Sequence, residues 1–132
     1  MNPSQERKIP PPSVNPENKP YFDAAAAGKL LLKFCNACNA FHHYPRALCP
    51  HCFSEKADWR DAKGSGTIHT YSVLRRGVPE PYCIAYVTLE EGVSMLTNLV
   101  DCEFDAVEIG MKVKVVFRPS EGGTAVPMFT PA

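Results

Sequence analysis

The strongest constraint on this chain is a set of four cysteines in two pairs, Cys35-x-x-Cys38 and Cys49-x-x-Cys52, with ten residues between the pairs. Two such pairs are the ligand pattern of a four-thiolate zinc ribbon, in which two tight turns point their sulfurs at one ion. Pro50 fixes φ in the second turn, and Asn39 follows the first pair, where such turns favour a positive φ. Four protein ligands leave no open position for water or substrate, so we expect the ion to be structural.

Other interpretations of the four cysteines remain open. Iron in a rubredoxin-like site uses the same thiolate geometry, and the sequence does not separate it from zinc. Two disulfides would require a secreted protein, but the first residues, MNPSQERKIPPP, contain no apolar segment of a signal peptide. No run of about 18 apolar residues predicts a membrane span either. We therefore expect a cytoplasmic protein.

Other cysteines and histidines are expected to be less informative. His42, His43 and His51 lie near the cysteine pairs, and we interpret them as solvated loop residues because four thiolates already complete the ligand shell. Cys83 and Cys102 lie in apolar, strand-like segments. No motif supplies a base or a positive neighbour to either thiol, so we interpret both as small buried hydrophobic residues.

Size and charge limit the classes of function. A chain of 132 residues with 45% hydrophobic residues forms one compact domain or two small modules that share a core. Lys and Arg number 14, as do Asp and Glu, so the formal net charge is zero. Proteins that bind duplex nucleic acid usually have a basic excess, which this chain lacks.

The chain divides into three predicted parts, of which the first is a proline-rich arm over residues 1–18. Six prolines fall within the first 20 residues, which excludes a helix or a central strand there. The arm is either disordered or a strap laid over a partner subunit, and its isolated apolar residues favour the strap.

Residues 19–62 are predicted to form a helix followed by the zinc ribbon. The helix spans about 19–27, with Asn18 as its N-cap, Pro20 in its first turn and Gly28 at its end. Its buried face is expected to carry Tyr21, Phe22 and Ala25. Short strands over residues 30–34 and 41–44 and another around position 59 complete the ribbon.

Residues 63–132 are predicted to form a small closed barrel of five antiparallel strands of even length. The strands cover about 66–76, 82–90, 93–101, 111–119 and 125–130, separated by turn residues such as Glu91-Gly92. Gly64 and Gly66 are expected to let the first of these strands bend around a corner. The predicted fold class is therefore mainly β: an N-terminal helix, a rubredoxin-like zinc ribbon and a five-stranded OB-fold barrel.

An ordered series of motifs resembles one known family. After the first C-x-x-C come Tyr44-Pro45-Arg46, the C-P-x-C pair, Trp59 and Gly64-x-Gly66-Thr67, then P-Y-x-x-A-Y-V-x-L-x-E-G over 81–92 and I-G-x-x-V-x-V-x-F over 109–117. This series is similar to the acyl-CoA-associated zinc-ribbon and OB-fold family, known as domain of unknown function family 35, over about residues 20–130. The chain departs from the family at Asn39, where Gly is common, but Asn also tolerates a left-handed turn.

The resemblance implies a non-catalytic accessory subunit. Members of the family scaffold complexes with thiolase-fold enzymes, which include thiolases, acyltransferases and aldolases, and they help to form the acyl-CoA channel. The resemblance therefore implies a hetero-oligomer with a thiolase-like partner, structural Zn²⁺, and CoA or acyl-CoA shared with that partner. The sequence agrees in containing no Walker-type phosphate loop and no nucleophile elbow, so we expect no catalytic residue.

Candidate contacts to the CoA phosphates are basic residues near loops. Arg75 and Arg76, beside the 77–81 loop, are the best pair, and Arg46 and Lys33 at the ribbon are the second. The alternative function is a module that binds single-stranded nucleic acid, since OB-folds use stacking aromatics and zinc ribbons occur in nucleic-acid machinery. Tyr71, Tyr82, Tyr86 and Phe117 would then stack on bases, although the zero net charge argues against a basic groove.

Overall fold

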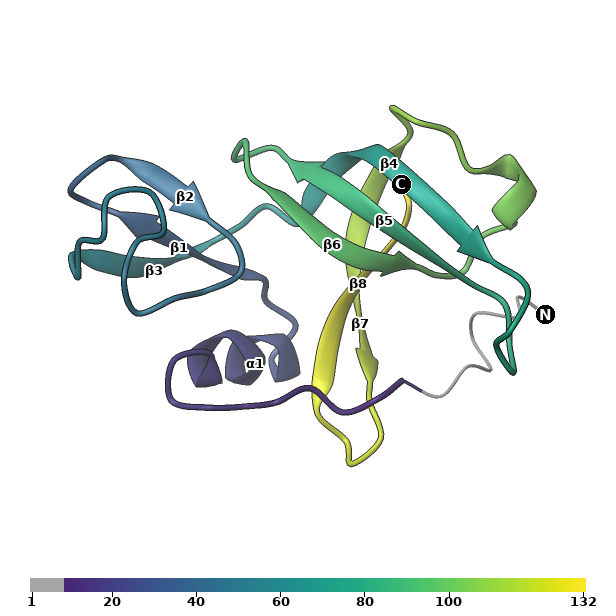
Figure 1. The fold of residues 1–132 in the computed structure, drawn as a ribbon, viewed down its shortest axis with the longest axis horizontal. Coiled ribbons are helices and arrows are strands. Elements are labelled where there is room, and N and C mark those ends of the chain that lie inside the picture. Colours follow the sequence, from purple (N-terminus) through teal and green to yellow (C-terminus); the bar gives the residue numbers. More distant parts are fainter. Residues whose placement is uncertain (1–8) are drawn as a thin grey trace.

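The computed structural model describes residues 9–132 and contains a small ribbon module beside a β-barrel (Figure 1). The helices and strands are α1 (Lys19–Ala26), β1 (Leu31–Cys35), β2 (Ala40–His42), β3 (Ala57–Asp61), β4 (Ser65–Leu74), β5 (Tyr82–Leu89), β6 (Ser94–Leu99), η2 (Phe104–Ala106), β7 (Lys112–Pro119) and β8 (Ala125–Pro131). The mainly β fold class predicted from the sequence is confirmed.

Helix α1 matches its prediction closely. It begins one residue before Pro20 and buries Tyr21, Phe22 and Ala25 on one face. Gly28 adopts φ +79° and ends the helix. The N–H of Gly28 donates to the carbonyl of Ala25, and the N–H of Lys29 donates to the carbonyl of Ala24. These two hydrogen bonds form a Schellman motif.

Asn18 occupies the predicted N-cap position, but its side chain does not cap the helix. Instead its Oδ1 accepts from the N–H of Asn15 (2.8 Å), and its Nδ2 donates to the carbonyl of Ser13 (2.9 Å) and to the hydroxyl of Tyr44 (2.9 Å). Asn18 is buried, and its side-chain amide connects the segment before α1 to the ribbon. It makes these tertiary hydrogen bonds instead of a local cap.

The ribbon is a three-stranded antiparallel sheet in the order β2-β1-β3. Cys35 at the end of β1 lies opposite Ala40 of β2 and Ala57 of β3. The strand around Trp59 therefore returns to pair with β1 before the chain enters the barrel.

The barrel is closed in the order β4-β5-β6-β8-β7, with β7 pairing back to β4. The prediction of five antiparallel strands of even length needs correction. The strands range from 6 to 10 residues, and β6 runs parallel to β8, with Leu99 opposite Phe129. This pairing joins segments about thirty residues apart, which local patterns do not reveal.

Two glycines allow the barrel to close at the start of β4. A Cβ on Gly66 would lie 2.4 Å from the carbonyl oxygen of Thr88 in the neighbouring strand β5. A Cβ on Gly64, which has φ +79°, would lie 2.6 Å from a methyl carbon of Val115. A side chain at either position would therefore overlap the neighbouring strand, and the bend expected of these glycines stays a prediction.

One hydrophobic core joins the two modules. It contains Tyr21 and Phe22 of α1 and Leu32 of β1 together with barrel residues such as Ile68 and Phe129. The helix lies under the ribbon and against β8 (Figure 1). The ribbon is thereby fixed to the barrel by α1 and by the start of β1.

The described part of the predicted arm, residues 9–18, runs along the chain's own fold. The carbonyl of Ile9 accepts a hydrogen bond from the N–H of Glu121 (2.8 Å) in the β7–β8 turn. Residues 1–8 of the predicted arm lie outside the described residues. No helix in the described range 9–132 has the length and apolar character needed to cross a membrane.

Candidate metal centre

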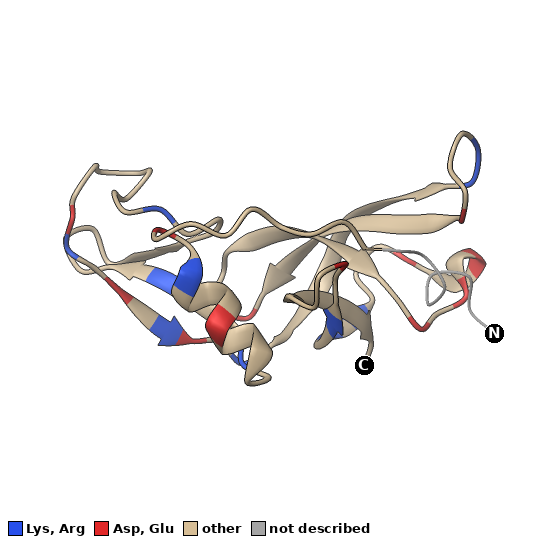
Figure 2. Ribbon diagram, turned by 90° about the horizontal axis from the view of Figure 1, so that it is seen from below, with Lys and Arg blue, Asp and Glu red and all other residues tan. Residues whose placement is uncertain are grey.

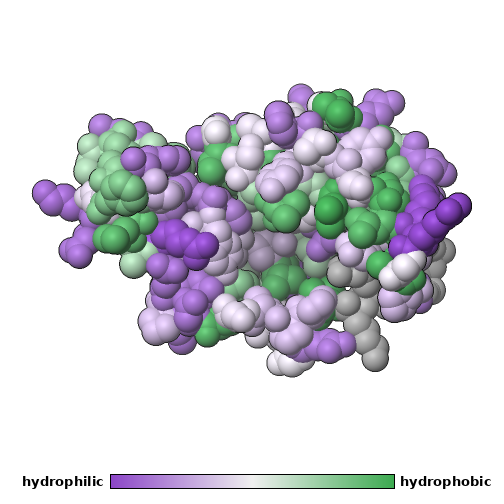
Figure 3. All heavy atoms as spheres, viewed as in Figure 1, coloured by the Kyte–Doolittle hydropathy of each residue, from purple (hydrophilic) through white to green (hydrophobic). Residues whose placement is uncertain are grey.

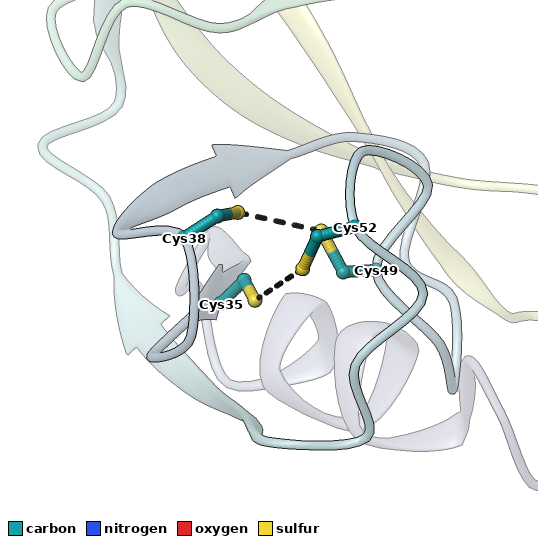
Figure 4. Close-up of side chains that lie close together, drawn as sticks. All are labelled: Cys35, Cys38, Cys49 and Cys52. Atoms are coloured by element: carbon teal, nitrogen blue, oxygen red, sulfur yellow. Dashed lines mark hydrogen bonds between the residues drawn. The ribbon is translucent and has the colours of Figure 1, made fainter.

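The four predicted ligand residues converge on one point of the ribbon. Cys35 ends β1, Cys38 follows in the turn to β2, and Cys49 and Cys52 come from the loop between β2 and β3 (Figure 4). All four Sγ atoms lie within 4.8 Å of one another. The Sγ atoms of Cys35 and Cys52 are 3.5 Å apart, and those of Cys38 and Cys49 are 3.7 Å apart.

These distances fit a tetrahedral metal ion. Four sulfurs at about 2.3 Å from a zinc ion would lie about 3.8 Å from one another. Cys35 and Cys49 are fully buried, while Cys38 and Cys52 face solvent. The cluster therefore has the spacing and donor type for a closed four-thiolate shell, and such a shell holds the chain together without offering a site for substrate.

In both cysteine turns, the residue after the second cysteine has a positive φ. The sequence predicted this for only one of the two turns. Asn39 follows the first pair with φ +56°, as predicted. Phe53 follows the second pair with φ +64°, although a bulky residue rarely adopts this conformation. The N–H of Phe53 donates to the carbonyl of Cys49 (2.8 Å), and the N–H of His51 donates to its Sγ (3.4 Å). Phe53 was missed because its residue type gives no turn signal.

The crowded sulfurs have displaced pKa values. Hydrogen bonds from the backbone N–H groups of Cys38 and Ala37 lower the pKa of Cys35 to about 7. Burial and the neighbouring sulfurs raise the pKa of Cys38 to about 12. The backbone at Ser54 lowers the pKa of Cys52, but the Cys35 sulfur and burial raise it further, so the net shift is upward. Four thiolates so close together need a cation between them.

The interpretation of the nearby histidines as solvated is wrong for two of the three. His42 is 2% exposed, and neither of its ring nitrogens has a hydrogen-bond partner among the described residues. His43 is half-buried and shares a hydrogen bond with the hydroxyl of Tyr21 (3.3 Å). Burial lowers the pKa of His43 to about 4. His51 is exposed, as expected. The ribbon packs on α1, which the local sequence could not show.

Cys83 and Cys102 agree with their interpretation as small hydrophobic residues. Cys83 is fully buried and Cys102 is half-buried. Burial raises the pKa of Cys83 to about 11 and also raises that of Cys102. Both thiols are therefore poor nucleophiles at neutral pH.

The four candidate CoA contacts fall into two separate groups. Lys33 and Arg46 lie on the ribbon, where Nζ of Lys33 is 4.7 Å from the ring centre of Trp59 and Arg46 forms an ion pair with Glu17 (3.4 Å). Arg75 and Arg76 lie in the β4–β5 turn, at the opposite end of the molecule (Figures 1 and 2).

Arg75 already forms an ion pair within the chain. Arg75 pairs with Asp105 (2.7 Å), and both side chains are largely exposed. Exposed pairs of this kind contribute little to stability, so Arg75 could exchange its carboxylate for a phosphate at small cost.

The fold and the site together define a class of protein, a four-cysteine zinc ribbon joined to an OB-fold barrel. Family models agree with this division: the model described as ChsH2, rubredoxin-like zinc ribbon domain, matches residues 22–57, and the model described as ChsH2, C-terminal OB-fold domain, matches residues 59–118. The chain belongs to the DUF35 family.

Three similar proteins illustrate the family. A DUF35 domain-containing scaffold protein of Methanothermobacter thermautotrophicus is 38% identical over 90 residues, which are 64% of this chain and 68% of that protein. A probable enoyl-CoA hydratase alpha subunit of Thermomonospora curvata is 35% identical over 127 residues. These cover 93% of this chain but 40% of the relative, so this chain spans less than half of that protein.

The third is a solved structure described as Ltp2-ChsH2(DUF35) aldolase. It superposes with a TM-score of 0.79 and 34% sequence identity, over 92% of this chain and 98% of the matched chain. This chain is thus similar, over nearly its full length, to a DUF35 chain whose structure is described together with an aldolase.

Proposed function

We propose that Cys35, Cys38, Cys49 and Cys52 bind one structural Zn²⁺. The proposal is supported by the sulfur spacing and by the family description of this region as a zinc ribbon. Metal analysis of the purified protein should give about one zinc per chain. A red protein that contains iron would show that the site binds iron and not zinc. A protein with no metal and four free thiols would contradict a metal site altogether.

We further propose that the chain is a non-catalytic accessory subunit of a thiolase-superfamily complex that acts on acyl-CoA. One observation carries the proposal: the match over 98% of the DUF35 chain in the Ltp2-ChsH2 aldolase structure. The enoyl-CoA hydratase name of a second relative agrees with a setting in acyl-CoA metabolism. The chemistry would belong to the larger partner, because the described residues offer a closed metal shell and two thiols of raised pKa.

Affinity purification of the tagged chain from its own host tests this proposal. The expected result is a stoichiometric complex whose second chain is identified by mass spectrometry as a thiolase-fold enzyme. Recovery of the tagged chain alone, or with only nucleic acid, from a host that expresses such enzymes would contradict it.

We also propose that one of the two basic groups contacts the CoA phosphates within the complex. Arg75 and Arg76 are the first choice, because their turn is exposed and its ion pair is weak. Replacing both with Ala should weaken CoA binding to the assembled complex about tenfold or more, since charged hydrogen bonds to phosphate are lost. Lys33→Ala/Arg46→Ala is the matched variant at the ribbon, and unchanged binding in both variants would contradict the proposal.

We propose a cytoplasmic location, because a site of four metal-binding thiolates suits a reducing compartment.

A further inference from the structure

The outer surface of the barrel over β4, β5 and β6 carries two rows of cross-strand neighbours. Thr70, Tyr86 and Leu96 form one row, and Ser72, Ile84 and Asn98 form the other. We call these six residues the uncharged face. They point away from the core because the alternate residues of β5 and β6 are buried inside the barrel.

The uncharged face combines exposure with apolar character. Leu96 is 54% exposed and Tyr86 is 46% exposed, although they lie directly opposite each other on adjacent strands. A shallow groove of about 180 Å³ runs beside them. Figure 3 shows green and pale residues over this part of the barrel, in the view in which β5 and β6 cross the front. Leu96 and Tyr86 thus place two exposed apolar side chains next to each other on adjacent strands.

An open strand edge adjoins the uncharged face. Within residues 9–132, β6 pairs with β5 along its whole length but with β8 only at Leu99. The backbone of residues 94–98 therefore has strand partners on one side alone. Edge strands are usually protected by charged residues or proline, and β6, with the sequence SMLTNL, contains neither.

The edge of the ribbon sheet provides a contrast within the same molecule. Strand β3 also has one free edge, and its sequence ADWRD contains Asp58, Arg60 and Asp61. Strand β2, at the other edge of the ribbon sheet, also lacks charge and proline, but it is only three residues long. Strand β6 is thus a six-residue edge without any of these protections. The backbone of β6 is therefore available for pairing with another molecule.

The surface continues from β6 toward the metal centre. A groove of about 520 Å³ lies between the ribbon and the β5–β6 turn, and its lining includes Ser94 at the start of β6 and His51 of the second cysteine turn. Phe53 of the same turn is 77% exposed. An occupant of the uncharged face could extend along this groove to the ribbon.

The size of the uncharged face argues against a homodimer that forms through this face alone. Three strands at about 4.8 Å spacing, each contributing roughly five residues at about 3.3 Å, give a face of about 250 Å². Two copies joined through this face alone would bury about 500 Å² in total, well below the ~1,200 Å² of a specific interface. A stable contact therefore needs a partner large enough to cover the groove and the ribbon as well.

We propose that the uncharged face and the open edge of β6 form the docking surface for the larger thiolase-like enzyme subunit. This inference rests on the proposed function. A protein partner with an uncharged surface fits the face better than a nucleic acid does, because none of its six residues can neutralise a phosphate. The partner's own strand or flat apolar surface would cover the unpaired backbone of residues 94–98.

The test compares Leu96→Lys with Ile109→Lys. Ile109 is 69% exposed and follows η2, outside both grooves, so it controls for the addition of one lysine at an exposed apolar position. Each variant is mixed with the thiolase-fold chain that co-purifies with the wild-type protein, and the affinity is measured. We expect Leu96→Lys to weaken binding at least about 30-fold, as at an interface hot spot, and Ile109→Lys to bind like the wild type.

Hydrogen exchange gives a second measurement that does not depend on a variant. Complex formation should slow exchange of amides within residues 94–98 while leaving those of the β7–β8 turn unchanged. Zinc content and thermal unfolding of both variants should match the wild type, because both positions are exposed.

The outcomes separate this inference from the proposed function. If the wild type binds the thiolase-fold chain, and Leu96→Lys binds equally well without slowed exchange in β6, the docking surface is wrong and the accessory role stands. If the wild type recovers no such chain, the proposed function fails and the inference with it. A homodimer that Leu96→Lys dissociates, or binding of oligothymidine that Tyr86→Ala abolishes, would also overturn the inference.

Discussion

His43 and Tyr21 meet where α1 packs on the ribbon, and their contact links protonation to stability. Burial lowers the pKa of His43 from 6.5 to about 4, and it also lowers the pKa of His42. The unfolded chain therefore binds more protons than the folded chain between these two pH values. The free energy of unfolding must fall as the pH decreases through this range.

We predict that stability is fully present above about pH 6.5 and decreases toward pH 4, by at most about 1.4 kcal/mol per pH unit for His43. Chemical denaturation at several pH values measures the slope. His43→Gln should show a shallower slope than the wild type, with zinc content monitored in both because acid also protonates the thiolates. Equal slopes in the two proteins would show that His43 does not cause the pH dependence of stability.

Some properties of single residues near the metal centre could be predicted from the sequence, and others could not. The four cysteine ligand candidates and the turn at Asn39 were predicted, because spacing and residue type carry that information locally. The positive φ of Phe53 and the burial of His42 were not. Both depend on tertiary packing around the ribbon, which forms no repeat or signature in the sequence.

At the scale of elements, strand β4 depends on a glycine that the sequence identified. Gly66 lies so close to β5 that an added methyl group would overlap the carbonyl oxygen of Thr88. We predict that Gly66→Ala lowers the free energy of unfolding by about 1–3 kcal/mol, the range for overpacking. Thermal or chemical denaturation measures the loss.

Gly77→Asn is the matched control for Gly66→Ala. Gly77 lies in the β4–β5 turn with φ +74°, and nothing lies within 4 Å of the position that a Cβ atom would occupy there. Because Asn tolerates this φ, the change should cost less than about 1 kcal/mol. Similar losses in both variants would show that the close approach of β4 and β5 does not limit this position.

The elements also show where local patterns are insufficient. Helix α1, the hairpin at Glu91-Gly92 and the five barrel strands follow from periodicity and turn residues. The parallel pairing of β6 with β8 does not, because closure of the barrel decides it. The short extent of that pairing leaves the free edge of β6, the feature on which the docking surface depends.

For the whole molecule, the shared core predicts that the ribbon and the barrel unfold as one cooperative unit. Leu32 of β1 is 1% exposed and belongs to the same core as Ile68 and Phe129 of the barrel. We predict that Leu32→Ala lowers stability by about 2–4 kcal/mol and that tryptophan fluorescence from Trp59 and far-UV circular dichroism still report one coincident transition. Two separated transitions would show that the modules unfold independently.

Native mass spectrometry of the complex isolated from the host shows whether this chain is a zinc-containing subunit of a thiolase-fold enzyme. We expect an assembly in which each copy of this 14.6 kDa chain carries one zinc ion and associates with a thiolase-fold chain. A spectrum that contains this chain only as a free monomer or homo-oligomer, under conditions that preserve other complexes from the same host, would contradict it.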